Sequence, residues 1–179
     1  MNDRRFGRRY IADERDRAFA LPIRATKRRQ RYWYDGRWFG DQGATPHCVG
    51  YAFSHWMISA PVSNYLDPDG VYGFCKLIDA DDEEGTTLRS AAKVLTRLGV
   101  IAECRWAATL RQLINAVLER GPVVVGTNWY ESMMNPTRDA ALAIAGDVVG
   151  GHAYLISGVD VDSHTFRLKN SWGQRWGKS

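Results

Sequence analysis

The sequence predicts an α+β fold, because helical patterns come first along the chain and strand patterns follow them. Apolar residues recur at three- and four-residue spacing after Cys48 and again after Gly85. A short apolar run at 123–125 and a hairpin pattern after residue 151 predict buried strands. With 179 residues, the chain is long enough to build one domain with a real core.

Three segments predict helices from this spacing: 48–60, 88–98 and 110–118. Thr86 or Thr87 is a candidate N-cap of the second helix, and Gly99 is its expected stop. The stretch that contains Asp67-Pro68-Asp69-Gly70 predicts turns. The acidic run at 79–84 predicts a solvated lead-in to the second helix, since it lacks the spacing of a calcium loop.

The second half of the chain predicts strands joined by turns. Residues 152–161 are expected to form one strand, Asp162-Ser163 a turn, and residues 165–169 the partner strand. Residues 32–40 are expected to form short extended pieces around a turn at Asp35-Gly36, and residues 128–147 to be irregular.

Positive charge is concentrated at the N-terminus. Residues 1–31 carry eleven Lys and Arg against four acids, which leaves thirteen bases and sixteen acids in residues 32–179. We therefore expect a basic arm over 1–31, as a short pro-segment or a disordered extension, ahead of a domain over 32–179. Packing of this arm on the acidic body is favoured, and binding of nucleic acid is the less favoured alternative.

The chain has three cysteines, Cys48, Cys75 and Cys104, which do not form a disulfide framework and suit a reducing compartment. Cys75 and Cys104 are expected to be buried free thiols, with pairing as the alternative. No segment has the length of a membrane span or the pattern of a secretory signal, so a cytoplasmic location, no membrane partner and a monomer are expected.

Cys48 is the strongest candidate for chemistry. It ends a loop and begins an apolar helix, where the positive end of the helix dipole favours the nucleophilic thiolate. His152 begins a predicted strand and Asn170 follows its partner strand, so a hairpin would bring both to one edge of the sheet. A nucleophile, a base and a group that orients the base form the usual arrangement for acyl transfer.

The residues around these three positions form a recognisable pattern. Gln42-Gly43 lies six residues before Cys48, His152 precedes Ala153, and Lys169-Asn170-Ser171-Trp172-Gly173 is followed by Trp176-Gly177. This pattern resembles the papain-like cysteine peptidase family in its three diagnostic segments and in their order. Residues 121–125 also look like that family's Gly-Pro-Val strand, and the resemblance covers about 33–177.

The resemblance implies a fold and a set of roles. The fold has a helical subdomain with the nucleophile helix, an antiparallel β-sheet subdomain, and a cleft between them. Cys48 would be the nucleophile, His152 the imidazolium and general acid, and Asn170 the residue that orients it. Gln42 would donate to the oxyanion with the Cys48 amide.

The resemblance also suggests the cleft walls. Trp172 is similar to the family's indole that covers the His–Asn pair, and Trp129, Gly151 and His47 are expected to contact substrate. No cofactor or metal is implied, and His47 and the cysteines lack zinc-ligand spacing. His55 and His164 are expected at ordinary polar positions.

The chain departs from the family in places that bear on substrate choice. Thr45 replaces a disulfide cysteine, Val49 follows the nucleophile, and a cleft-lining Cys-Asn-Gly-Gly stretch is missing. The sequence stops soon after Trp176-Gly177, where relatives continue, so we expect a shortened or minimal domain.

The expected function is thiol-dependent hydrolysis of peptides or proteins. Two alternatives stay open: acyl transfer or amide hydrolysis on a non-protein or isopeptide substrate, and a silent domain that binds a partner through the basic arm. The presence of Cys48, His152, Asn170 and Gln42 together argues against the silent domain.

Overall fold

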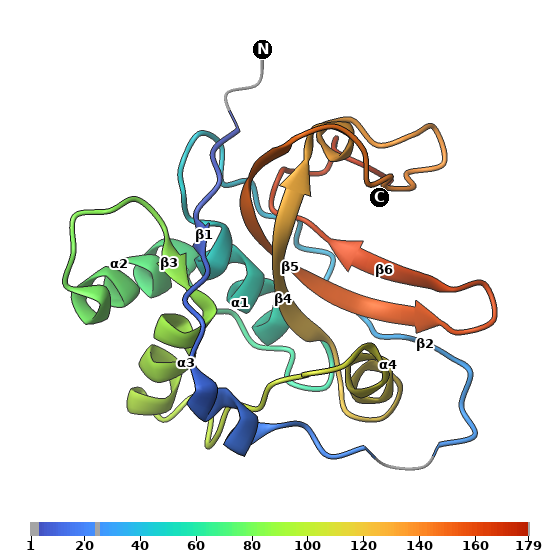
Figure 1. Ribbon diagram of the computed structural model, residues 1–179, viewed down its shortest axis with the longest axis horizontal. Coiled ribbons are helices and arrows are strands. Elements are labelled where there is room, and N and C mark those ends of the chain that lie inside the picture. The colour runs from blue at the N-terminus through green and yellow to red at the C-terminus, as the bar shows by residue number, and fades with distance from the viewer. Residues whose placement is uncertain (1–3, 24–25, 179) are drawn as a thin grey trace.

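The computed structural model describes residues 4–23 and 26–178. Helices α1 (Cys48–Ile58), α2 (Pro68–Asp79) and α3 (Leu88–Arg97) gather on one side, and an antiparallel sheet lies on the other. The N-terminal segment runs between them, as the dark-blue trace in Figure 1 shows. No helix in the described ranges is long and apolar enough to cross a membrane.

The sheet has the strand order β2-β5-β4, with β6 paired to β5 as well. Its strands are β2 (Gln30–Tyr32), β4 (Val123–Tyr130), β5 (Val148–Asp160) and β6 (Thr165–Lys169). Helix α4 (Leu110–Glu119) packs on this sheet through a cluster that includes Val117, Leu118, Ile156 and Val159. Strand β2 covers residues 30–32 and so spans the expected boundary at residue 31. The end of the N-terminal segment therefore belongs to the sheet.

A second core cluster joins the helices to the sheet. Val49 and Ala52 of α1, Leu95 of α3 and Ala153 of β5 belong to it. Helix α1 thus lies against β5, which fixes the position of Cys48 at the N-terminus of α1 relative to the strand that carries His152.

The predicted helices all form, and one helix was not expected. Thr87 caps α3 by accepting a hydrogen bond from the Ser90 amide, as predicted. The turn prediction for residues 67–70 is wrong, because these residues begin α2. Asp67 is its N-cap and Pro68 its first residue, where the missing amide hydrogen of proline is harmless.

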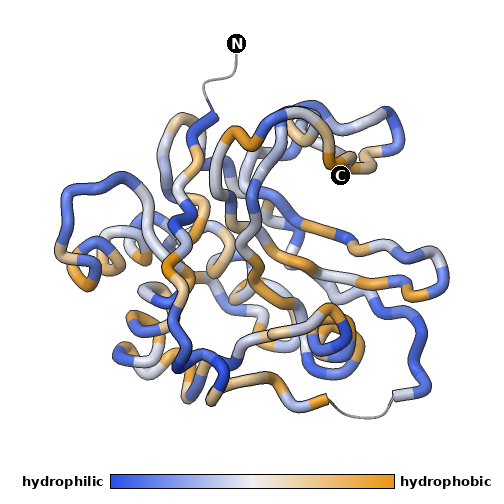
Figure 2. The backbone as a smooth tube through the Cα atoms, viewed as in Figure 1, coloured by the Kyte–Doolittle hydropathy of each residue, from blue (hydrophilic) through white to orange (hydrophobic). Residues whose placement is uncertain are grey.

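The N-terminal segment is folded onto the body. It contains β1 (Arg8–Arg9), paired in parallel with β3 (Thr86–Thr87), and a 3₁₀ helix, η1 (Glu14–Phe19). Figure 2 shows η1 as a strongly hydrophilic stretch. Arg89 of α3 donates to Asp13, the N-cap of η1, at 2.8 Å and to Asp16 within η1 at 2.6 Å. We call residues 4–23 the arm.

His55 is a core residue, so its expected polar position is wrong. It is fully buried in the last turn of α1, 5.0 Å from the Trp38 ring centre. Neither ring nitrogen has a hydrogen-bond partner among the described residues. Burial, with a smaller effect of the Lys169 ammonium, lowers the pKa of His55 to about 3.

Acidification should therefore destabilise the protein through His55. Its folded pKa of about 3 lies below the ordinary 6.5, so the unfolded state binds the proton first. Stability is fully present above pH 6.5 and falls as pH drops toward 3, by on the order of 5 kcal/mol over the whole window. Urea unfolding between pH 7.5 and pH 4.5 measures this slope.

The variant His55→Leu tests this assignment. It should reduce the pH dependence of the unfolding free energy, because it removes the buried imidazole whose pKa is lowered. Equal slopes in the parent and His55→Leu would contradict the prediction.

Candidate active site

Cys48 is the first residue of α1 and has no exposed surface. Burial raises the pKa of its thiol to about 11, although the backbone amides of Ala153, Gly7 and Val49 oppose this by favouring the thiolate. One of these amides follows His152 on β5, and another belongs to the arm. The thiol is therefore held neutral between the helix, the sheet and the arm.

His152 and Asn170 meet as the sequence predicts. Asn170 Oδ1 lies 2.7 Å from His152 Nε2 and also accepts a hydrogen bond from the Ser171 amide at 2.8 Å. Because an amide oxygen only accepts hydrogen bonds, His152 Nε2 must carry the hydrogen that it donates to Asn170 Oδ1. His152 Nδ1 is buried and has no partner among the described residues, which leaves it free to exchange a proton.

Aromatic rings enclose His152. Trp129 and Trp172 have their ring centres 4.8 and 5.0 Å from the imidazole centre, and both are almost fully buried. This burial, opposed by the Asn170 bond, lowers the pKa of His152 to about 4. Trp129, expected on the substrate wall, packs on His152 and on Trp172 and is fully buried.

Gln42 is buried and held in place at both ends of its amide. Its Oε1 accepts a hydrogen bond from the Ser171 hydroxyl at 2.6 Å. Its Nε2 donates to the Thr45 carbonyl at 2.7 Å and to the Arg5 carbonyl of the arm at 3.1 Å. The Gln42 amide thus donates to a peptide carbonyl of the arm.

The arm packs directly against Gln42, Cys48 and His152. The Phe6 ring centre is 5.9 Å from that of His152 and 6.1 Å from that of Trp172. The Gly7 carbonyl accepts from the Thr86 amide at 2.8 Å. A Cβ placed on Gly7 would lie 1.7 Å from the Pro46 carbonyl oxygen, so only glycine fits here.

Ion pairs fasten the arm, and they use the acidic run that the sequence predicted to be solvated. Arg9 donates to both carboxylate oxygens of Asp81 at 2.8 Å, and Arg5 donates to Glu84 at 2.8 Å. The expectation that the basic arm packs on an acidic body agrees with these contacts.

The arm has a defined direction in the cleft. Arg4 donates to the Trp172 carbonyl at 3.0 Å, and Arg8 and Arg9 pair in parallel with Thr86 and Thr87. Its earlier residues therefore lie on the Trp172 side, and its later residues lie on the β3 side.

The remaining predicted wall residues have different surroundings. Gly151 contacts the arm directly, since a Cβ there would lie 2.2 Å from the Arg8 carbonyl oxygen. His47 lies at the N-cap of α1, bonded through Nδ1 to Asp69 at 2.7 Å and stacked on Tyr72. His47 is adjacent to Cys48 in the chain, but its ring contacts residues of α2.

Sequence reasoning missed the arm residues Phe6 and Gly7 and the sheet glycines Gly126 and Gly150. A Cβ at Gly150 would lie 2.5 Å from the Phe6 ring. The available signal was the glycine pair ahead of His152, which removes side chains from the wall of the cleft. Cys75 and Cys104 are both free, and Cys104 is only partly buried. No metal-binding group of His, Cys, Asp or Glu occurs within the described ranges.

Solved structures share this fold. Xylellain, a cysteine protease from Xylella fastidiosa, aligns over 97% of this chain and 87% of that chain, with TM-score 0.71 and 19% identity. Procathepsin B S9 from Trypanosoma congolense aligns over 96% and 78%, with TM-score 0.60 and 12% identity. The chain therefore has the papain-like α+β fold, and the predicted fold class is confirmed.

The similarity in sequence is local. A cathepsin B-like cysteine proteinase 5 from Caenorhabditis elegans is 34% identical over 71 residues, which are 38% of this chain and 21% of that protein. The chain thus matches about a fifth of the length of this relative. No protein-family model matches the sequence.

Proposed function

We propose that this protein is a thiol-dependent peptidase that acts through Cys48, His152 and Asn170, with Gln42 as an oxyanion donor. The observation that carries the proposal is the His152 ring. Its Nε2 is bonded to Asn170, while its buried Nδ1 has no partner among the described residues and lies on the strand against which α1 packs. One ring nitrogen thus fixes the orientation of the imidazole, and the other accepts the proton of the Cys48 thiol.

The reaction proceeds in two acyl-transfer steps. Cys48 transfers its proton to His152 Nδ1 and attacks the scissile carbonyl as thiolate. The imidazolium then protonates the leaving amine, which departs as the thioester forms. Water, deprotonated by the same nitrogen, attacks the thioester, and the proton returns to the sulfur as the carboxylic acid leaves. Asn170 keeps Nδ1 directed at the reacting atoms throughout.

Gln42 and the Cys48 amide stabilise the negative oxygen formed in each step. Gln42 Nε2 already donates to the Arg5 carbonyl, and its other end is fixed by Ser171, so the donor needs no reorganisation. Removing one such donor typically costs roughly 3 kcal/mol of barrier.

The arm is the pro-segment of this peptidase. It buries Cys48 and His152 and holds both in their neutral forms. A substrate must present its leaving amine to His152, so the residues after the cleaved bond lie toward Trp172. The arm runs the opposite way, with Arg4 at Trp172 and Arg8 at β3. This direction disfavours cleavage of the arm by the cysteine that it covers.

Active-site titration tests the proposal. An irreversible epoxide inhibitor of thiol peptidases, added after limited proteolysis that trims the arm, should modify one residue per molecule. Mass mapping should find it on Cys48, with loss of peptide hydrolysis in proportion. Modification of Cys75 or Cys104 with Cys48 intact in folded protein would refute the assignment. Parallel peptide, isopeptide and muropeptide substrates distinguish the substrate classes.

A further inference from the structure

The second half of the arm, residues 13–21, rests on a surface that the four candidate catalytic residues do not line. On this surface Arg89 of α3 donates to Asp16 at 2.6 Å and to Asp13 at 2.8 Å. Asp13 is also paired with Arg15 of the arm, whereas Arg89 is the only ion-pair partner of Asp16 among the described residues. The Arg89–Asp16 pair is therefore the most specific polar contact between this half of the arm and the body.

Trp106 supplies the backbone contacts of the same surface. Its amide donates to the Phe19 carbonyl at 2.9 Å, and its carbonyl accepts a hydrogen bond from the Leu21 amide at 2.8 Å. The centre of its ring lies 5.8 Å from the guanidinium carbon of Arg89. A short extended segment thus pairs with one residue of the body, while an acidic side chain of the same segment binds the neighbouring arginine.

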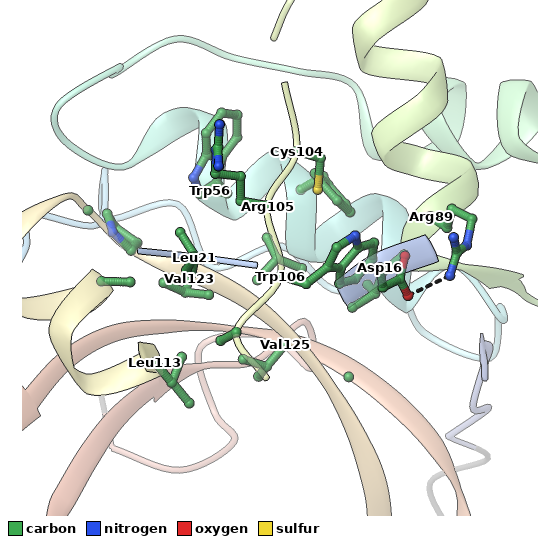
Figure 3. A pocket seen from close by; sticks show the side chains of 18 of the residues that line it. Asp16, Leu21, Trp56, Arg89, Cys104, Arg105, Trp106, Leu113, Val123 and Val125 are labelled. Atoms are coloured by element: carbon green, nitrogen blue, oxygen red, sulfur yellow. Dashed lines mark hydrogen bonds and ion pairs between the residues drawn. The ribbon is translucent and has the colours of Figure 1, made fainter. Parts of the chain in front are cut away.

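The paired segment ends at an apolar part of the molecule. Leu21, Val123 and Trp106 line a cavity of about 830 Å³. Figure 3 shows Leu21 beside Val123, with Trp106 between them and the Asp16–Arg89 pair in this view. The surface therefore binds an acidic side chain and, five positions later along the chain, an aliphatic one.

Departure of the arm would leave this surface with an uncompensated charge. Within residues 26–178, no carboxylate pairs with Arg89. Glu103, the acid of the body that lines the cavity, bonds through both oxygens to Arg105, at 2.6 and 2.8 Å. Arg120 also lines the cavity and adds positive charge. The Arg89 side chain is only 22% exposed, so a carboxylate ligand would bind a charge that water solvates incompletely.

We infer that Arg89, Trp106 and the adjoining cavity form a docking site for an acidic segment of a protein substrate, separate from the catalytic residues. The inference rests on the proposed peptidase function and adds which substrates the enzyme selects. The arm is the present occupant of the site. The segment that replaces it carries an acidic residue and, five positions later, an aliphatic residue, as the arm does with Asp16 and Leu21.

Peptide binding tests the docking site without any peptidase activity. The probe is a fluorescent synthetic peptide of residues 13–21. It is added to full-length protein that carries Gly7→Ala and Asp16→Asn, two changes that weaken the hold of the protein's own arm. Measured by fluorescence anisotropy, the dissociation constant of this peptide should be at least about tenfold lower than that of its Asp16→Asn version.

Two arginine variants of this protein provide the controls. With Arg89→Gln, which removes the charge that binds the carboxylate, the two peptides should bind within about twofold of each other. Arg97→Gln makes the same change at the exposed last residue of α3 and should preserve the difference. Equal binding of the two peptides to protein with Arg89 intact would overturn the inference.

Matched substrates give the second measurement, on the same full-length protein. Each substrate has the residue 13–21 segment, with or without Asp16→Asn, joined to a cleavable sequence by a linker of about ten Gly and Ser residues. Tethering should lower the KM of the acidic substrate by about tenfold and leave kcat unchanged. Equal KM values would contradict the inference. If neither substrate is cleaved, the peptidase proposal fails, and the binding measurements still decide whether the docking site exists.

Discussion

Replacing Gly7 with alanine should raise the rate of Cys48 alkylation by iodoacetamide by about tenfold to a hundredfold. The added Cβ would lie 1.7 Å from the carbonyl oxygen of Pro46, a backbone atom two residues before Cys48. Forced overpacking of this kind costs about 1–3 kcal/mol, and each 1.4 kcal/mol changes the open population tenfold. We expect the arm to be the part that yields.

The Gly7→Ala experiment has a matched control in the same molecule. Gly73 lies in α2 with nothing within 4 Å of a Cβ placed on it, so Gly73→Ala makes the same chemical change without a clash. Its Cys48 labelling should equal that of the parent. An unchanged rate in Gly7→Ala would mean that the arm does not close the cleft in solution.

Replacing Cys48 with alanine in the Gly7→Ala background should abolish peptide hydrolysis. Removal of the nucleophile from a serine-protease triad lowers kcat by roughly 10⁶, and the same loss is expected here because no thioester can form. The assay is continuous fluorescence from a cleavable peptide, with loading by an epoxide inhibitor measured in parallel. The Gly7→Ala background ensures that a covered cleft does not mimic a lost nucleophile.

The other cysteines provide the control. Cys104→Ala removes a partly buried thiol that has no part in the proposed chemistry. It should retain hydrolysis and inhibitor loading. Residual hydrolysis in the Cys48→Ala variant that a thiol reagent still blocks would assign the nucleophile to a different residue.

Under the proposed function, the arm would keep the peptidase inactive. Burial raises the pKa of the Cys48 thiol and lowers that of the His152 imidazole, which disfavours the thiolate–imidazolium pair that the proposed attack requires. Release of the arm would expose both groups to water and would free the Gln42 amide from the Arg5 carbonyl. The proposal therefore links removal of the arm to the protonation state of Cys48 and His152.

Local patterns in the sequence were enough for most of the fold. The period of α1, the Thr87 cap and the hairpin of β5 and β6 depend on residues close in the chain, so they were predictable. Helix α2 was missed because Asp67-Pro68-Asp69-Gly70 suits a turn as well as a capped helix start. His55 was misplaced because burial of a polar side chain depends on Trp38 and Lys169, which are distant along the chain.

The sequence by itself determined the order of helices and strands and the candidate set of Cys48, His152, Asn170 and Gln42, since residue types and short spacings encode them. Only the tertiary structure decided that the basic arm runs parallel to β3 and that acidic residues of the α2–β3 loop hold it. Only the tertiary structure also showed that Arg8 packs against Gly126 and Gly151. These contacts join residues more than seventy positions apart in the chain. No local sequence pattern shows which distant segment will pack against a glycine.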